Sequence, residues 1–258
     1  MLDFGYYNMD CIEGMKQFPD KYFDLAIVDP PYGGGSNEYD ATTQRYGGIF
    51  DKYFPKEEEK GTHFHGRGRS KKYKDILIDV ERTGGTWAAK YGKNINHWDV
   101  APSKEYFDEL FRVSKNQIIW GGNYFDLPPT RCFVVWKKLT ISESFSMAMA
   151  EYAWTSFNDN AKIFECAPQG KKGDERFHPT QKPIALYEWL LSRYAKEGDI
   201  ILDTHVGSAS SLVACHNTNH KFVGFELDER YYQLSKARLE REMAQMNLFD
   251  FGLNPYQE

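Results

Sequence analysis

The sequence predicts an α/β protein built on a doubly wound, mostly parallel sheet. Short apolar runs of the length of buried strands alternate with stretches of helical periodicity. The runs are 23–28, 117–120, 199–203 and 221–225, and the helical stretches are 103–113 and 183–195. Such alternation places helices on both faces of a parallel sheet. With 258 residues, 41% of them hydrophobic, the chain can bury the core of a single domain spanning 1–258.

The remaining elements follow in chain order. Residues 12–18 favour a short helix, which a following proline would end. The runs 133–136 and 152–154 suit further strands, because they are rich in aromatic and β-branched residues. The stretch 228–245 is rich in Glu, Arg, Lys, Leu and Ala, which favours a charged surface helix. We expect that helix to pack through Tyr231, Leu234 and Ala237.

The strand at 23–28 runs directly into Asp29-Pro30-Pro31-Tyr32. Two prolines forbid continuation of the strand, and ligands of open α/β sheets bind at this carboxyl edge. The corner therefore offers a carboxylate, a proline carbonyl and a phenol ring. A carboxylate and a carbonyl that accept the two hydrogens of an exocyclic nucleobase amine would suit methyl transfer to that nitrogen. An ordinary strand-ending turn is the alternative, since Asp and Pro are common in turns.

A second constellation lies at 199–226. A short strand ending at Asp203 is followed by a turn of small residues, a helical stretch and another strand that ends at Glu226. Small residues let the backbone approach a ligand, and an acid in this position binds ribose hydroxyls. A dinucleotide site would need a turn with three glycines, and here only Gly207 stands in it. A ligand without phosphate therefore fits better.

The segment His178-Pro179-Thr180-Gln181-Lys182-Pro183 leads into the helix predicted at 183–195. Thr180 suits the N-cap and Pro183 suits the first turn. A helix N-terminus beside Lys182 is also a site for a carboxylate. The alternative is a purely structural role, in which the segment caps the helix and binds no ligand.

These motifs resemble those of the DNA amino-methyltransferases, which use S-adenosylmethionine to modify adenine N6 or cytosine N4. Asp29-Pro30-Pro31-Tyr32 resembles their catalytic motif, and 178–183 resembles the segment that holds the methionine end of the cofactor. The turn at 203–209 resembles their Asp-x-Phe-x-Gly-Ser-Gly motif, with His205 in place of the Phe and Ala209 in place of the last Gly. The catalytic motif comes first, as in the circularly permuted branch.

The resemblance implies a Rossmann-like methyltransferase fold, circularly permuted, with an inserted polar recognition region. It implies catalytic roles for Asp29, Pro30, Pro31 and Tyr32, and S-adenosylmethionine as the cofactor. Asp10 resembles the acid that contacts the cofactor's adenine, although a solvated turn aspartate is the alternative. The implied cofactor-binding residues are Asp10, Cys11, Asp29, His178, Thr180, Gln181, Lys182, Asp203, His205, Gly207, Ser208, Ala209, Glu226 and Leu227.

The expected reaction is methylation of N6 on an adenine flipped out of double-stranded DNA, because the amine cannot be reached inside the stack. In this family Asp at position 29 usually accompanies adenine and Ser accompanies cytosine. The alternatives are N4-cytosine methylation, a catalytically inactive DNA-binding relative, and an RNA or protein methyltransferase. Direct transfer needs neither a metal nor a covalent intermediate.

The net charge of the chain argues against a DNA partner, whereas a local run of basic residues argues for one. The net charge of −5 and the pI near 5.9 are unlike those of most nucleic-acid binders. The insertion at 35–96, however, is a candidate catalytic loop and target-recognition region, and it contains a run of basic residues without acids. We expect DNA contacts from Lys60, Arg67, Arg69, Lys71, Lys72 and Lys74. A solvated surface loop is the alternative for such a run.

The cysteines and the distribution of apolar residues indicate the cellular compartment. The four cysteines are far apart in sequence and form no metal-ligand pair, which favours reduced thiols in a cytoplasmic protein. No apolar run reaches the roughly 20 residues of a membrane span, and the start of the chain lacks the pattern of a secretory signal. The resemblance leaves two protein partners open. These are a second copy of the chain, since relatives in this branch are often dimers, and a cognate restriction endonuclease.

Overall fold

The computed structural model describes residues 1–32, 100–142, 148–169 and 176–250. The insertion predicted at 35–96 and its basic residues, Lys60, Arg67, Arg69, Lys71, Lys72 and Lys74, lie outside the described residues. The catalytic corner and all the predicted cofactor-binding residues lie within them.

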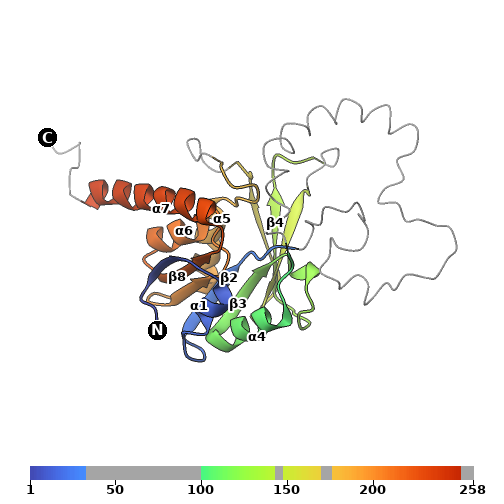
Figure 1. The fold of residues 1–258 in the computed structure, drawn as a ribbon. Helices are drawn as coiled ribbons and strands as arrows, with labels where there is room; N and C mark the ends of the chain where they lie inside the picture. The colour runs from blue at the N-terminus through green and yellow to red at the C-terminus, as the bar shows by residue number, and fades with distance from the viewer. Residues whose placement is uncertain (33–99, 143–147, 170–175, 251–258) are drawn as a thin grey trace, which may run out of the picture.

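One mixed sheet of eight strands organises the described part of the chain (Figure 1). Its order is β1 (Gly5–Asn8), β8 (Lys221–Glu226), β7 (Ile200–Asp203), β2 (Phe23–Val28), β3 (Ser114–Trp120), β5 (Ala150–Thr155), β4 (Phe133–Lys138) and β6 (Lys162–Cys166). Neighbours from β1 to β3 are parallel, β5 is antiparallel to β3 and β4, and β6 is parallel to β4. The predicted doubly wound, mostly parallel sheet is confirmed.

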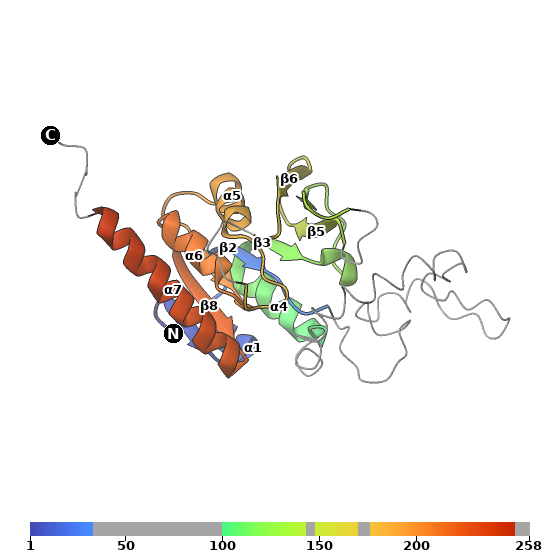
Figure 2. The ribbon, with the colours of Figure 1, turned by 90° about the horizontal axis from the view of Figure 1, so that it is seen from above.

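Helices cover both faces of the sheet (Figures 1 and 2). On one face lie α1 (Cys11–Met15) and α4 (Lys104–Val113), and on the other lie α5 (Ile184–Tyr194), α6 (Ser210–Asn217) and α7 (Glu229–Asp250). Alternate residues of β2 enter the two cores: Ala26 and Val28 pack with α1 and α4, while Leu25 and Ile27 pack with α5 and α6. Burial on both sides explains why this strand is a continuous apolar run.

The chain diverges at the carboxyl ends of the two central strands. After β2 the path leads through α4 on one face to β3, and after β7 it leads through α6 on the opposite face to β8. Because β2 and β7 are parallel neighbours, with Ala26 opposite Leu202, this is the topological switch point of the sheet. Ligands of doubly wound sheets bind in the crevice that such a divergence leaves.

Two edge strands and one cap differ from the prediction. The edge strands β1 and β6 were not predicted, because they are short and only partly buried, so their sequences lack a clear apolar run. The N-cap of α5 is Pro183 and not Thr180. Thr180 instead contacts the ring of His178, with 3.2 Å between its Oγ1 and Nδ1.

The packing face of α7 was also predicted wrongly in part. Tyr231 is buried as expected, but Leu234 is 42% exposed and Ala237 is exposed. Leu239 is buried on the same face, but two other positions that face the protein are polar. The Ser235 hydroxyl lies 2.6 Å from that of Tyr6, and Arg238 donates to the carbonyl of Ser208 at 2.7 Å. A search for apolar periodicity misses a helix face that is held by hydrogen bonds.

All four cysteines are free thiols. Burial raises the pKa of Cys11 to about 12 and also raises that of Cys215, so both thiols stay protonated at neutral pH. Among the helices of the described ranges, none has the length and apolar character that crossing a membrane requires.

The polar face of α7 gives the first prediction. Arg238→Met keeps most of the side-chain volume but removes the bond to the Ser208 carbonyl, so it should lower the free energy of unfolding by about 1–3 kcal/mol. Leu234→Ala, on the exposed face of the same helix, should change it by no more than about 0.5 kcal/mol. Urea denaturation of both variants measures the difference. A larger loss for Leu234→Ala would contradict the observed face.

Candidate active site

Asp29 lies one residue beyond β2, at the switch point of the sheet. Its two carboxylate oxygens have different partners: Oδ1 accepts the hydroxyl of Tyr32 at 2.7 Å, and Oδ2 accepts the ammonium of Lys182. The side chain is 14% exposed. Between Asp29 and Tyr32, Pro30 is buried and Pro31 is half-buried. The corner thus presents one carboxylate oxygen toward its own tyrosine and the other toward a distant part of the chain.

Tyr32 is held by residues that follow β3. Its ring stacks on Tyr124 with centroids 4.8 Å apart and meets Phe125 edge-on at 6.2 Å. Gly121 lies against the same ring, and a Cβ there would fall 2.2 Å from Cε1 of Tyr32. Gly121 also has a left-handed φ of +66°. Glycine therefore serves two needs at this position, the backbone conformation and the close approach of the ring.

Lys182 is a buried ammonium between two carboxylates. It bonds to Oδ2 of Asp29 and lies 3.2 Å from Oε2 of Glu151, while Oε1 of Glu151 pairs with Lys138 at 2.6 Å. Burial acts to lower the pKa of Lys182, but Asp29 and Glu151 raise it above its ordinary value. Burial acts to raise the pKa of Glu151, but Lys182 and Lys138 lower it. Lys182 and Glu151 are therefore held charged.

Sequence motifs had predicted a different partner for Lys182, the methionine end of the cofactor, and had assigned no role to Glu151 or Lys138. Glu151 lies on β5 and Lys138 on β4, in the antiparallel part of the sheet. The available signal was charge in two largely apolar strands, since a charged side chain that is buried requires a partner. Sequence spacing does not reveal that partner, because it lies on another element.

The turn after β7 is organised by two acids. The buried carboxylate of Asp203 accepts the hydroxyl of Ser211 and the backbone N–H of His205, and burial raises its pKa to about 7. Glu226 accepts the backbone N–H of Gly207 at 2.8 Å and that of Asp228 at 2.9 Å. Burial raises the pKa of Glu226 as well. The acid at the end of β8 therefore lies directly against the small-residue turn.

The turn itself contains two left-handed residues, Gly207 at φ +54° and Ala209 at φ +62°. Ala209 is the N-cap of α6 and is fully buried. The hydroxyl of buried Ser208 lies 3.0 Å from that of Ser210. A glycine would adopt this conformation at position 209 with less strain, which explains why the related motif has one.

Two histidines line the turn. A Cβ on Gly207 would lie 3.2 Å from the ring of His178, so the segment at 178–183 packs directly on the turn. Burial, with Lys182, lowers the pKa of His178 to about 3. Burial also lowers the pKa of His205 to about 4, and its Nδ1 lies 2.9 Å from the hydroxyl of Thr204. Both rings are therefore neutral at physiological pH.

The remaining predicted residues surround these groups. Asp10 is the N-cap of α1, where Oδ1 accepts the N–H groups of Ile12 and Glu13. Cys11 follows it, half-buried. Gln181 is buried and accepts the N–H of Phe177 at 3.3 Å. Leu227 is 68% exposed beside Glu226, which leaves an apolar surface open at the carboxyl edge.

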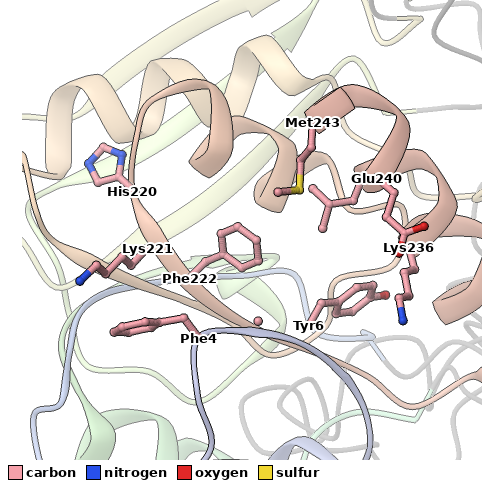
Figure 3. A pocket seen from close by; sticks show the side chains of 10 residues that line it. Phe4, Tyr6, His220, Lys221, Phe222, Lys236, Glu240 and Met243 are labelled. Carbon is pink, nitrogen blue, oxygen red and sulfur yellow. The ribbon is translucent and has the colours of Figure 1, made fainter. Parts of the chain in front are cut away.

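A hollow of about 370 Å³ lies elsewhere, among β1, β8 and α7 (Figure 3). Phe4 precedes β1 and Tyr6 lies at its start, Lys221 and Phe222 come from the start of β8, and Met243 comes from α7. Because these are the amino ends of parallel strands, the hollow is at the opposite edge of the sheet from Asp29 and Glu226. It is separate from the candidate active site.

Comparison with known proteins identifies the class that this fold and site define. A family model described as DNA methylase, of the N6/N4 type, matches residues 56–237. The chain belongs to this N6/N4 DNA methylase family, and it is a DNA methyltransferase. S-adenosylmethionine is the cofactor of the family.

Individual relatives extend the match over nearly the whole chain. The putative methylase YubD of Escherichia coli is 33% identical over 92% of this chain and 91% of its own length. The type II methyltransferase M.HpaI of Haemophilus parainfluenzae is 25% identical over 93% of this chain and 76% of its own. A solved structure, the cytosine-N4-specific PvuII DNA methyltransferase, has a TM-score of 0.54 at 13% identity, covering 94% of this chain and 91% of that one, and shows the same fold.

The residues at the cleft fit S-adenosylmethionine. A ribose needs hydrogen-bond acceptors, and Glu226 supplies them at the end of β8. A flat ring needs apolar surface, and exposed Leu227 supplies it next in the chain. The glycine-poor turn suits a ligand that carries no phosphate.

Gly121 gives a prediction for the site. Gly121→Ala should displace the ring of Tyr32 and lower the rate of DNA methylation by about a hundredfold, since a misplacement of about 1 Å can cost that much. Gly198→Ala is the matched control, because Gly198 also has a positive φ, +83°, but has nothing within 4 Å of the added Cβ. Both variants carry similar backbone strain. Equal losses of activity, measured with labelled cofactor, would show that strain and not ring displacement is responsible.

Proposed function

We propose that this protein transfers a methyl group from S-adenosylmethionine to N6 of an adenine flipped out of double-stranded DNA. The observation that carries the proposal is the geometry of Asp29: Lys182 holds one carboxylate oxygen, and the other bonds to the hydroxyl of Tyr32 at the switch point of the sheet. A substrate amine can take the place of that hydroxyl on Oδ1. The carboxylate is thus held in place before the substrate arrives.

Asp29 and the carbonyl of Pro30 accept the two hydrogens of the amine and pull its nitrogen toward tetrahedral geometry. The lone pair is then less delocalised into the ring and more available for attack. The negative charge of Asp29 also stabilises the positive charge that develops on nitrogen. When bound, the cofactor supplies a methyl group activated by its sulfonium. Once the methyl group is transferred, the sulfur departs as a neutral thioether.

Tyr32 has a separate role, as an aromatic surface for the flipped base. Its ring is already fixed by Tyr124 and Gly121, so little side-chain entropy is lost when a base arrives. Burial, followed by the charge of Asp29, raises the pKa of Tyr32, so its hydroxyl remains a donor at neutral pH. That donor must release Asp29 before the amine binds.

On the other side of the cleft we propose that the cofactor is held by the residues predicted from the sequence. Glu226 binds the ribose hydroxyls, and Asp10 and Leu227 lie beside the adenine. The turn at 205–209 and the segment at 178–182 enclose the methionine end. The close packing of His178 on Gly207 supports this assignment, because it makes the two segments one wall.

Adenine is favoured over cytosine by Asp at position 29, since in the family Asp usually accompanies N6-adenine and Ser accompanies N4-cytosine. DNA is proposed to contact the basic residues between Lys60 and Lys74, and the reaction to take place in the cytoplasm. The name of the relative M.HpaI, a type II methyltransferase, suggests a restriction-modification system with a cognate endonuclease. A homodimer is a further proposal from the same family.

Asp29→Asn tests the proposed chemistry. The amide keeps the shape of the side chain but lacks its charge, so the rate of methyl transfer to DNA should fall by about a hundredfold or more. Asp108→Asn, on the solvent face of α4, is the control, because Asp108 is exposed and its ion pair is with the exposed Lys104. It should retain the full rate.

The product identifies the target. The wild-type protein and labelled cofactor are incubated with DNA, RNA and protein, and the modified nucleoside is identified by mass spectrometry. N6-methyladenine in DNA is the expected product, and N4-methylcytosine would favour the alternative base. Label found in RNA or protein instead of DNA, or an unchanged rate in Asp29→Asn, would reject the proposal.

A further inference from the structure

Four charged side chains from four parts of the chain meet behind the catalytic corner. Asp29 follows β2, Lys138 ends β4, Glu151 lies on β5, and Lys182 precedes α5. The ion pairs connect them in a row, from Asp29 to Lys182, then to Glu151 and on to Lys138. We name this row the charge cluster.

The charge cluster is shielded from water. The side chains of Lys182 and Lys138 are 3% and 5% exposed, and those of Asp29 and Glu151 are 14% and 25% exposed. Each ammonium also lies near a tryptophan ring, Lys182 at 5.3 Å from Trp120 and Lys138 at 5.1 Å from Trp136. In such an environment charges act on one another more strongly than at the surface. The two carboxylates and two ammonium groups sum to zero.

This balance matters for the proposed reaction. As the new nitrogen–carbon bond forms and the sulfur–carbon bond breaks, the amine nitrogen becomes positively charged until it loses a proton to solvent. The charge develops beside Oδ1 of Asp29, one side chain away from the ammonium of Lys182. An excess positive charge in the cluster would oppose it.

We infer that Glu151 and Lys138 are positioning residues for methyl transfer. Glu151 offsets the charge of Lys182 and fixes its ammonium on Oδ2 of Asp29, so that Oδ1 stays directed at the target amine, and Lys138 balances Glu151. The inference rests on the proposed role of Asp29 and extends it to residues that no sequence motif indicated. Neither residue is a catalytic residue, because Glu151 acts through Lys182 and Lys138 acts through Glu151.

Charge compensation tests the inference. Glu151→Gln leaves the cluster with one excess positive charge and should lower kcat by about tenfold to a hundredfold. Adding Lys138→Met restores neutrality, so the double variant should recover at least about tenfold of that loss. The KM for S-adenosylmethionine should change less than kcat, since neither residue is placed at the cofactor. Methyl transfer to DNA is measured under single-turnover and steady-state conditions for the wild type and for both variants.

If Glu151 and Lys138 only stabilise the fold, the expected result is different. Glu151 and Lys138 are in contact, so their effects on the free energy of unfolding need not add. With a merely structural role the second substitution would not restore kcat, and the double variant would be as slow as Glu151→Gln alone or slower. That result would overturn the inference, as would a wild-type kcat in Glu151→Gln. If Glu151→Gln does not fold, the neutral double variant decides: a kcat within about tenfold of wild type supports the inference, and a lower one overturns it.

Failure of the proposed function is distinguishable from failure of the inference. A full rate in Asp29→Asn would overturn the role of Asp29 and the inference with it. A large loss in Asp29→Asn together with a full rate in Glu151→Gln would overturn the inference alone.

Discussion

The bond between the carboxylate of Asp29 and the ammonium of Lys182 is the constraint on which the site depends. It joins the end of β2 to the segment before α5, two parts of the chain separated by 153 residues. Neither group could be buried alone, because removing one partner of such a pair typically costs about 3–5 kcal/mol. The catalytic corner and the segment that borders the cofactor turn are therefore placed by the same interaction. Glu151 and Lys138 complete it from the antiparallel part of the sheet.

The fold explains why this interaction occurs at the cleft. Strands β2 and β7 are parallel neighbours, and their connections leave on opposite faces, so the crevice between them opens at their carboxyl ends. Asp29 directly follows β2, Asp203 ends β7, and Glu226 ends the neighbouring strand β8. The residues proposed for substrate chemistry and for cofactor recognition thus come from adjacent strands, although their motifs lie far apart in the sequence. The circularly permuted order changes the connections and leaves this edge intact.

Sequence analysis predicted the parts of the molecule in which apolar pattern and turn chemistry coincide. The strand at 23–28, the helix after Ser103 and the unit from 200 to 226 were found because buried strands are continuous apolar runs and helices carry apolar residues at helical spacing. It missed the polar face of α7 and the edge strands, which apolar periodicity does not mark. It also missed Glu151 and Lys138, because a buried charge is explained only by its partners, and those partners come from other elements. Gly121 was likewise visible only once the ring of Tyr32 was placed against it.

Lys182 is a charged group held between two carboxylates. Burial alone would lower its pKa, whereas Asp29 and Glu151 raise it above the ordinary value for lysine. Nuclear magnetic resonance of the protein labelled with ¹⁵N-lysine, with Lys182 assigned by substitution, can follow its Nζ through an alkaline titration. The account predicts that this ammonium remains protonated after the exposed lysines have lost their protons. Deprotonation before the exposed lysines would contradict it, since burial would then outweigh the two carboxylates.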